Sequence, residues 1–545
     1  MRGAAVATAV GMVGLAVMTT GCSGTPHYVP PAHTYYVAAD GDDTADGTAP
    51  DSAWRTLDRA DRTKLRPGDR LLLEGGARFR GTVTVGRDEA GDPGRPVVIG
   101  SFGSGRAVVT SAAEPAVSVH DTGGVQIRDL VLRGAPASRA HDAGVNLYSD
   151  LQSGARPSGI TVSGVDVSGF RVGLAVGASR HGVGFRDVTV SQASLHGNKD
   201  IGLLTYGPDF KPARAAYAHE NLTLDSVAAY GNPGDPNAHD RHTGDGIVVG
   251  SVRGATVRHV DAHDNGARAA SDAPEGPVGV WAYDATRVVI EESVSYRNHT
   301  GSTVDGAGFG LDSNVSDSAL RRNLAFDNDG PGFYAYQRWT NGAHARNTIS
   351  HNISAGDGRA LPEHGAVAVY GTDIHDLAVV QNTVLLSRSP AGTGPALRLQ
   401  TGEHGVVVRN NLFVTEGVPL VLADRGLTRS DVVLQGNDYR SADGDWQVSW
   451  GTESYGSLAA WREATGQETA GGKATGLDVD PCLAGGALPE IRSVADASRT
   501  VPTCPALAGK GVEPPLPGGV PAVGPVDYFG HTVAAPPQVG AVVPR

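Results

Sequence analysis

A group of carboxylates, a histidine and an arginine lies near the middle of the 545-residue chain. These side chains occur in or beside three polar segments, 233–243, 266–277 and 299–307, which separate short apolar runs. Such residues could hydrolyse a glycosidic bond with two carboxylates, or eliminate across a uronate with a base and carboxylate-bound calcium. The candidate catalytic residues are Arg241, His242, Asp245, Asp284, Asp305 and Asp312.

The two chemistries assign these residues differently. In an elimination, calcium would neutralise the substrate carboxylate, and its ligands would be Asp245, Asp284 and Asp312, with Asp305 as a further candidate. The base would be one of His242, Arg241 and Lys199. In a hydrolysis, Asp312 would pair with Asp284 or Asp305, because the reaction needs two carboxylates about 5–9 Å apart. No sequence motif separates the two chemistries, and the Asp-Gly pairs at 245–246 and 305–306 also suit ordinary turns.

The elements that must position these residues repeat along the chain. Short apolar segments recur about every 31 residues between positions 148 and 423. They lie at 145–148, 174–177, 203–206, 247–250, 280–283, 309–312, 333–336, 367–370, 397–400 and 420–423. Strands of four or five residues with this period predict a parallel β-solenoid, since leucine-rich repeats would show fixed leucines and propeller blades are longer.

Asparagines recur between the predicted strands in two series. The first is Asn198, Asn232, Asn265, Asn298 and Asn328, and the second is Asn323, Asn352, Asn382, Asn411 and Asn437. Asparagines stacked at the same turn of successive coils can form a ladder of amide hydrogen bonds along the stacking axis. The two series therefore predict two such ladders.

Strand alternation separates the side chains that face the core from those that face outward. The outward positions carry many aromatic residues, and Asp312 is the one carboxylate in its column. Aromatic faces with polar edges suit sugar rings, although a loop or the C-terminal tail could instead cover them. The predicted sugar-binding residues are Tyr206, Trp281, Tyr283, Tyr334, Tyr336 and Tyr370.

The N-terminus has the pattern of an export signal. Residues 1–21 contain an apolar stretch that is too short for a stable membrane span, and small residues precede Cys22. This pattern predicts a lipoprotein signal peptide, lipidation of Cys22 and a tether over 22–33, with an ordinary secretory signal as the alternative. The protein would then be extracellular and would touch the membrane only through its lipid anchor. The remaining cysteines, Cys482 and Cys504, would form a disulfide.

Segments at both ends and the central repeat together resemble the right-handed parallel β-helix proteins of the pectate-lyase-like superfamily. The resemblance rests on residues 35–43, 54–57, 67–69 and 96–109 at one end and on 455–468, 480–481, 527–530 and 539–541 at the other. It implies an all-β fold with an N-terminal capping helix within 53–65 and a C-terminal capping tail. The expected parts are an N-terminal cap with the first coils over 34–120, a central β-helix with a groove over 121–451, and a C-terminal cap and tail over 452–545.

Composition narrows the class of partner. The net charge is −13 and no run of lysines or arginines occurs, which argues against nucleic acid as a partner. The fold and the aromatic columns favour a polysaccharide-active enzyme, and we expect a lyase acting on a uronate-containing glycan. A glycoside hydrolase and a non-catalytic glycan-binding or adhesive protein are the alternatives. An acidic chain suits an acidic polymer only if calcium bridges the two. Both solenoid ends carry predicted caps, so a monomer is expected.

Overall fold

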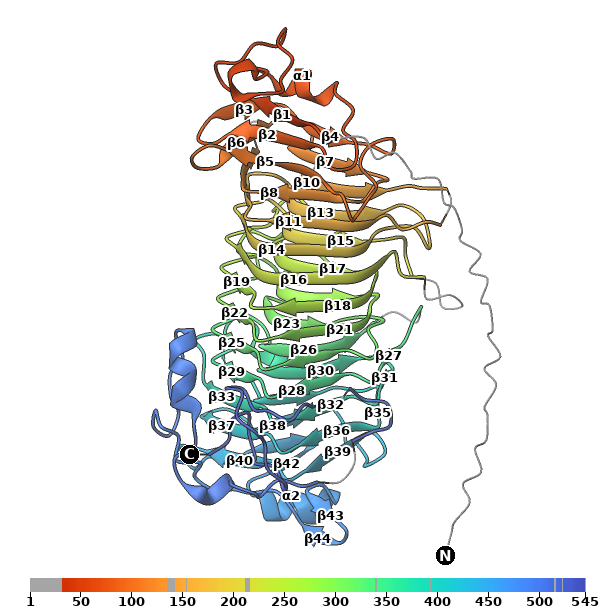
Figure 1. The fold of residues 1–545 in the computed structure, drawn as a ribbon. Coiled ribbons are helices and arrows are strands. Elements are labelled where there is room, and N and C mark those ends of the chain that lie inside the picture. The colour runs from red at the N-terminus through yellow and green to blue at the C-terminus, as the bar shows by residue number, and fades with distance from the viewer. Residues whose placement is uncertain are drawn as a thin grey trace, which may run out of the picture.

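The computed structural model describes residues 32–134, 143–152, 154–210, 216–338, 341–392, 394–513, 516–521 and 523–544. These residues form one elongated solenoid of stacked parallel strands, as predicted (Figure 1). The predicted signal peptide, Cys22 and most of the tether lie outside the described residues. Within the described residues, no helix is long and apolar enough to cross a membrane.

One face of the solenoid is a 14-stranded sheet in which only the last pair of strands is antiparallel. Its strands, in order, are β4 (Val83–Val85), β7 (Val117–His120), β10 (Ala143–Ser149), β13 (Val172–Ala178), β15 (Ile201–Tyr206), β17 (Asp245–Gly250), β20 (Val278–Tyr283), β23 (Ala307–Leu311), β26 (Phe333–Gln337), β30 (Val367–Gly371), β34 (Leu397–Leu399), β38 (Val421–Ala423), β41 (Val448–Trp450) and β42 (Glu453–Tyr455). The register aligns Gly250 with Tyr283 and Tyr336 with Tyr370, as strand alternation predicts.

The other faces are built from two further stacks of parallel strands, which share β14 (Arg186–His196) and β16 (His219–Tyr230). The first stack also contains β1 (Thr34–Val37), β2 (Arg70–Glu74), β5 (Val97–Phe102), β8 (Val125–Arg128), β11 (Ser158–Ser163), β18 (Val252–Arg258), β21 (Thr286–Glu291), β24 (Ala319–Arg321), β28 (Thr348–Ser350), β32 (Ala378–Val380), β36 (Val406–Arg409) and β39 (Val432–Gln435). The second also contains β3 (Arg78–Arg80), β6 (Ala107–Ser111), β9 (Leu130–Gly134), β12 (Asp166–Ser168), β19 (Asp261–His263), β22 (Val294–Tyr296), β25 (Leu324–Phe326), β29 (Ile353–Ala355), β33 (Thr383–Ser387), β37 (Leu412–Glu416) and β40 (Asp438–Ser441). A small sheet joins β27 (His344–Ala345), β31 (Ile374–His375) and β35 (Glu403–His404).

The core is a continuous column of apolar side chains inside the coils. Alternate residues of the 14-stranded sheet are fully buried there, including Ile247, Val249, Val280 and Phe309. Phe309 stacks on Phe333 of the next coil with ring centroids 5.3 Å apart. Because alternate residues enter this core, their neighbours on the same strands must face outward.

Both predicted asparagine ladders are present. Asn265, for example, accepts from the Asn232 side chain at 2.9 Å and donates to Asn298 at 2.9 Å. Each ladder ends on a buried carboxyl: Asn328 donates to Asp357 at 2.8 Å, and Asn437 donates to Glu468 at 2.7 Å. The ladders hold successive coils in register, because their buried amides are hydrogen-bonded to the neighbouring coil.

Caps close both ends. At the N-terminal end the helix α1 (Leu57–Asp61) is shorter than the predicted 53–65, because Trp54 pairs with Val37 as a bridge and Thr56 caps the helix. At the other end α2 (Leu458–Thr465) buries Trp461 against the last coils. The remaining short elements are η1 (Pro50–Ser52), η2 (Pro362–His364), η3 (Val494–Thr500), η4 (Pro505–Leu507), β43 (Thr469–Ala470) and β44 (Lys473–Ala474).

The C-terminal tail runs back along the outside of the solenoid, beside β29, β33 and β37 (Figure 1). Val539 and Ala541 are fully buried against apolar residues of these strands, and the Ala541 amide donates to Thr383 at 2.9 Å. A disulfide joins Cys482 to Cys504, as predicted. Through Val539 and Ala541, the tail therefore covers the face formed by β29, β33 and β37. These two residues do not contact the outward aromatic residues of the 14-stranded sheet.

Candidate active site

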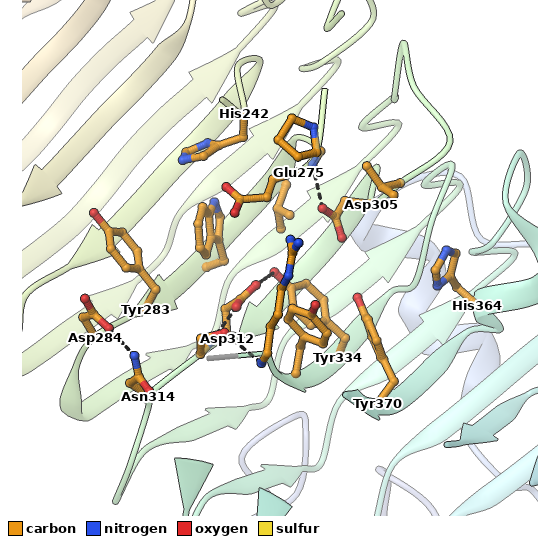
Figure 2. A pocket seen from close by; sticks show the side chains of 18 of the residues that line it. His242, Glu275, Tyr283, Asp284, Asp305, Asp312, Asn314, Tyr334, His364 and Tyr370 are labelled. Carbon is orange, nitrogen blue, oxygen red and sulfur yellow. Dashed lines mark hydrogen bonds between the residues drawn. The ribbon is translucent and has the colours of Figure 1, made fainter. Parts of the chain in front are cut away.

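A pocket of about 520 Å³ opens on the outer face of the 14-stranded sheet. Its floor comes from β20, β26 and β30, and its walls come from loops beside these strands and on both sides of β23 (Figure 2). The residues that line it are Asp209, His242, Pro274, Glu275, Gly276, Val278, Trp281, Tyr283, Asp284, Val304, Asp305, Asp312, Ser313, Asn314, Tyr334, Tyr336, Arg338, Asn341, His364 and Tyr370.

All three predicted polar segments contribute to the walls, through His242, Glu275 and Asp305. The loop after β15 supplies Asp209 on another side, and its Phe210 carbonyl accepts from the Asn341 side chain at 2.9 Å. Segments 131 residues apart in sequence thus meet at the rim. The site is a walled pocket rather than an open stripe along the sheet.

The aromatic floor depends on glycines in the preceding coil. A β-carbon at Gly250 would lie 2.3 Å from the Tyr283 ring, and one at Gly310 would lie 2.1 Å from the Tyr334 ring. Each ring therefore lies flat over a glycine, because any side chain there would occupy the same space. Five of the six predicted sugar-binding aromatics line the pocket, whereas Tyr206, which lies over Gly177, is outside its lining.

Asp312 follows β23 and faces into the pocket (Figure 2). Its carboxylate accepts from the Ser313 amide and from the Tyr334 hydroxyl, the latter at 3.2 Å. Burial, together with the negative charge of Asp305, raises the pKa of Asp312 to about 7. A carboxyl with this pKa can hold a proton near neutral pH and deliver it to a substrate.

Asp305 precedes β23 and faces the same space (Figure 2). Its carboxylate accepts from the Gly276 amide at 2.7 Å, which ties two of the wall loops together. Burial, with the charges of Asp245 and Glu275, raises the pKa of Asp305 to about 6. Asp305 therefore ionises before Asp312, so the two carboxyls differ in protonation over a narrow range of pH.

His242 and Asp245 form a hydrogen-bonded pair at the upper wall. The Asp245 carboxylate is fully buried and contacts His242 Nδ1 at 2.7 Å, Trp281 Nε1 at 2.8 Å and the Val278 amide at 3.0 Å. Burial alone would lower the pKa of His242, but the negative charge of Asp245 raises it to about 9. A protonated imidazole is thus held at the pocket wall, edge-on to the Trp281 ring at 5.2 Å.

Asp284 lies beside Tyr283 and Asn314 at the edge of the pocket (Figure 2). Its carboxylate accepts from the Asn314 side chain at 2.6 Å, and burial raises the pKa of Asp284. Burial and the charges of Asp312 and Asp305 also raise the pKa of the Tyr334 hydroxyl. These neutral hydroxyl and amide groups give the pocket hydrogen-bond partners suited to sugar hydroxyls.

The structure brings most of the predicted catalytic residues together. Asp284, Asp305, Asp312 and His242 line the pocket, and Asp245 lies directly behind His242. Arg241 does not line it, because its guanidinium points to Asp200 at 3.2 Å and to Asp240 at 3.2 Å. Lys199 likewise pairs with Asp235 at 2.7 Å, outside the lining.

Several lining residues were not among the predicted site residues: Asp209, Glu275, Asn314, Arg338, Asn341 and His364. Glu275 could have been predicted from the sequence, since it lies in one of the polar segments that carry the candidate aspartates. His364 comes from η2, in the coil after Tyr334, and its neighbouring sequence carries no periodic pattern.

The three proposed calcium ligands do not converge. Asp245 contacts His242 and Trp281, Asp284 contacts Asn314, and Asp312 contacts Ser313 and Tyr334. Among the described residues, the one group with ligand atoms all within 4.8 Å is His120, Asp121 and Asp150, far along the sheet. Calcium binding therefore stays a prediction without a formed ligand set in this pocket.

Comparison with known proteins gives both a family match and relatives. Residues 115–384 match the family described as right handed beta helix region. A 98-residue stretch is 35% identical to lacto-N-biosidase of Bifidobacterium longum subsp. longum, and it covers 17% of this chain and 6% of that protein.

Solved structures agree on the fold. A GH136 lacto-N-biosidase from Eubacterium ramulus superposes with a TM-score of 0.50 at 17% identity, over 71% of this chain and 65% of that chain. The complex structure of XylC with xylose superposes with a TM-score of 0.52 at 8% identity, over 94% and 98%. The fold is thus a right-handed parallel β-helix, and these similar proteins are carbohydrate-active.

Proposed function

We propose that this right-handed β-helix protein is a glycoside hydrolase that cleaves a glycan in the pocket described above. The observation that carries the proposal is that Asp312 and Asp305 face one pocket with pKa values raised to about 7 and about 6. Glycoside hydrolysis needs one protonated and one ionised carboxyl on either side of the scissile bond. The similarity to lacto-N-biosidase supports the same class of reaction.

Asp312 is the general acid in this proposal, because its pKa is the higher of the two. It would protonate the glycosidic oxygen as the bond to the anomeric carbon breaks, so that the leaving sugar departs with a hydroxyl group. Asp305 would be ionised, and would either activate a water molecule or attack the anomeric carbon itself. In both cases water supplies the hydroxyl of the new reducing end.

The aromatic residues would bind the sugar rings. Trp281, Tyr283, Tyr336 and Tyr370 line the pocket around the two carboxyls. Sugar rings present apolar C–H faces that pack on such rings, while their hydroxyls reach polar groups at the rim. The protonated His242 lies within the electrostatic range of Asp305 and would favour its ionised form.

A polysaccharide lyase is the second candidate. The observation that favours it is that Arg338 and His242, two cationic groups, line the same pocket and could face a uronate carboxylate. In this case a base would remove the C5 proton, and no water would be added.

Export is part of the proposal. The sequence of residues 1–22 supports secretion and lipidation at Cys22, which would place the enzyme outside the cell, attached to its envelope. Replacing Cys22 by serine should then move the protein from the membrane fraction to the soluble fraction. Retention of the Cys22→Ser protein in the membrane fraction would contradict the anchor.

The enzymatic proposal is tested with a panel of neutral and uronate-containing glycans, with and without a chelator. New reducing ends without ultraviolet absorbance from an unsaturated sugar, unaffected by the chelator, are expected for a hydrolase. Asp312→Asn should lower the rate by about 100-fold or more. Unsaturated products that disappear with the chelator would instead establish the lyase, and glycan binding without either product would indicate a non-catalytic protein.

A further inference from the structure

Among the described residues, the carboxyls of the pocket lack the cationic partner that many exposed carboxyls elsewhere on the solenoid have. Five carboxyls belong to the lining: Asp209, Glu275, Asp284, Asp305 and Asp312. Within the described residues, no lysine, arginine or histidine nitrogen lies within 4.0 Å of any of these five carboxylates. The ion pairs of the described residues all involve other acidic residues.

Outward carboxylates on other faces are paired across neighbouring coils. Asp264 contacts Arg297 at 2.7 Å, Asp317 contacts Arg346 at 2.7 Å, and Asp166 contacts Arg133 at 2.6 Å. The chain thus places an arginine one coil away from many of its exposed acids, whereas none of the five pocket acids takes part in such a pair within the described residues. The excess of acidic groups in the pocket is local, within a chain whose net charge is −13.

The cationic side chains of the lining do not cancel this excess. His242 is already paired with Asp245 at 2.7 Å, and burial lowers the pKa of His364, which keeps that imidazole neutral. Arg338 supplies one guanidinium against five acidic side chains, of which Asp312, with its pKa raised to about 7, holds a proton part of the time near neutral pH. A substrate carboxylate would therefore enter a site of its own sign, whereas a positive group would be attracted.

The aromatic floor also favours a positively charged group. Tyr334 and Tyr370 lie with ring centroids 5.9 Å apart, and Tyr336 lies 4.7 Å from Tyr370, so three neighbouring rings line the same pocket as the carboxyls. Aromatic faces attract cations through their quadrupole, and carboxylates beside such faces strengthen the attraction. Aromatic rings and unpaired carboxyls together also suit the apolar face of a sugar that carries a positive substituent.

We propose that the pocket selects glycans with free, protonated amino groups, that is, unacetylated hexosamine residues, over N-acetylated sugars and uronates. The inference rests on the glycoside hydrolase function proposed above and names the substrate class for the same site. The protonated amine would lie among the unpaired carboxyls, with the sugar ring on the aromatic floor.

Binding and hydrolysis are measured separately to test the inference. The Asp312→Asn chain is titrated calorimetrically with tetrasaccharides of glucosamine, N-acetylglucosamine and galacturonic acid. We expect the glucosamine tetrasaccharide to bind at least about tenfold more tightly than the other two, and the advantage to shrink with added salt. Equal affinities, or tightest binding of the uronate, would overturn the inference.

Two further variants localise the effect. Adding Glu275→Gln should reduce the preference for the amine about tenfold, whereas Asp272→Asn, on the same loop but exposed and paired with His239, should leave it unchanged. Equal effects of the two substitutions would also overturn the inference. Hydrolysis of the three tetrasaccharides by the unsubstituted chain tests the proposed function. Preferred binding of the amino sugar without cleavage would contradict the hydrolase function and leave the inferred substrate class standing. Cleavage without a preference for the amino sugar would contradict only the inferred substrate class.

Discussion

The surroundings of Asp312, directly after β23, account for its raised pKa and hence for its proposed role as the acid. Its column otherwise holds aromatic residues and glycines, and the neighbouring rings bury the carboxyl that replaces them. Burial disfavours the charged form, which raises the pKa of Asp312 to about 7, and the nearby Asp305 adds to the effect. The same surroundings that bind a sugar ring therefore also prepare the acid.

The pH dependence of kcat/KM follows from these two carboxyls. Asp305 must lose its proton, with a pKa of about 6, and Asp312 must keep its own, with a pKa of about 7. We expect activity to fall below about pH 6 and above about pH 7, as a narrow bell. Initial rates at low substrate concentration measure the profile, and activity that keeps rising toward pH 9 would contradict these roles.

Asp245 is a positioning residue, since its buried carboxylate contacts His242 and Trp281 and does not itself line the pocket. In Asp245→Asn the charge that raises the pKa of His242 to about 9 is lost, and burial should then lower the pKa to its ordinary value or below. NMR titration of the His242 ring measures this change. The acid limb of the activity profile should move downward, because the negative charge of Asp245 raises the pKa of Asp305 more than the positive charge of His242 lowers it, and both charges are lost at neutral pH.

Asp272→Asn is the matched control for this variant. It removes the carboxylate partner of an exposed histidine, His239, outside the pocket lining. It should leave the His242 titration and the activity profile unchanged. An Asp245→Asn chain with an unchanged His242 pKa would show that Asp245 does not set the protonation of this wall.

At the scale of the strands, the pocket floor depends on the pairing of small and large residues in adjacent coils. Coils stack about 4.8 Å apart, a spacing at which outward rings can stack on each other, as His196, Tyr230 and His263 do on another face. On the pocket floor, Tyr283 instead covers Gly250 and Tyr334 covers Gly310, the glycine of the coil before. The orientation of these rings is therefore set by residues that never touch the substrate.

Gly250→Ala tests this dependence. The new methyl group would lie 2.3 Å from the Tyr283 ring and 2.7 Å from the Thr205 carbonyl oxygen, so the ring must move toward the pocket and the strand must shift slightly. We expect KM to rise severalfold with a smaller change in kcat, because the carboxyls stay in place. Gly426→Ala, where no atom lies within 4 Å of the added group, is the control and should behave as the unsubstituted chain. Equal kinetics for the two variants would contradict the proposed role of the floor.

Part of this arrangement could be predicted from the sequence and part could not. The solenoid, the asparagine ladders and the outward columns follow from periodicities that recur from coil to coil, and the structure confirms them. Loop conformations carry no such periodicity. Arg241, in the polar segment 233–243, is a predicted catalytic residue, yet its guanidinium turns to Asp200.

The loops also account for what the sequence did not reveal. Asp209 and Asn341 reach the same rim only through a contact between segments 131 residues apart, and neither belongs to a strand column. The capping helix α1 is shorter than expected because bridge formation by Trp54 competes with helix formation at its start. In each case a contact between distant segments, which the local sequence pattern does not reveal, sets the conformation.

At the scale of the whole molecule, buried ionisable groups couple stability to pH. Burial raises the pKa values of Asp357, Asp438 and Glu403 to about 7, and Asp245 raises that of His242 to about 9. A group whose pKa is higher in the folded state stabilises the fold fully below its unfolded pKa, and this contribution is lost as pH rises through the folded pKa. Between pH 6.5, the unfolded value of histidine, and pH 9, all four groups act in the same direction.

The free energy of unfolding should therefore be lower at pH 9 than at pH 6.5 by about 2 kcal/mol or more. Urea denaturation followed by circular dichroism at the two pH values measures the difference. Replacing His242 by glutamine should remove the largest part of it. An unchanged or higher urea midpoint at pH 9 would contradict the burial and pairing described for these groups.

The central claim is that the pocket adds water across a glycosidic bond with Asp312 as the acid. The most direct measurement is mass spectrometry of the products formed from a glycan panel in oxygen-18 water, with the unsubstituted chain and with Asp312→Asn. A hydrolase places one oxygen-18 atom at each cleavage site, and the Asp312→Asn chain should form about 100-fold less of this product. Unlabelled, unsaturated products, or labelled products formed equally by both chains, would contradict the claim.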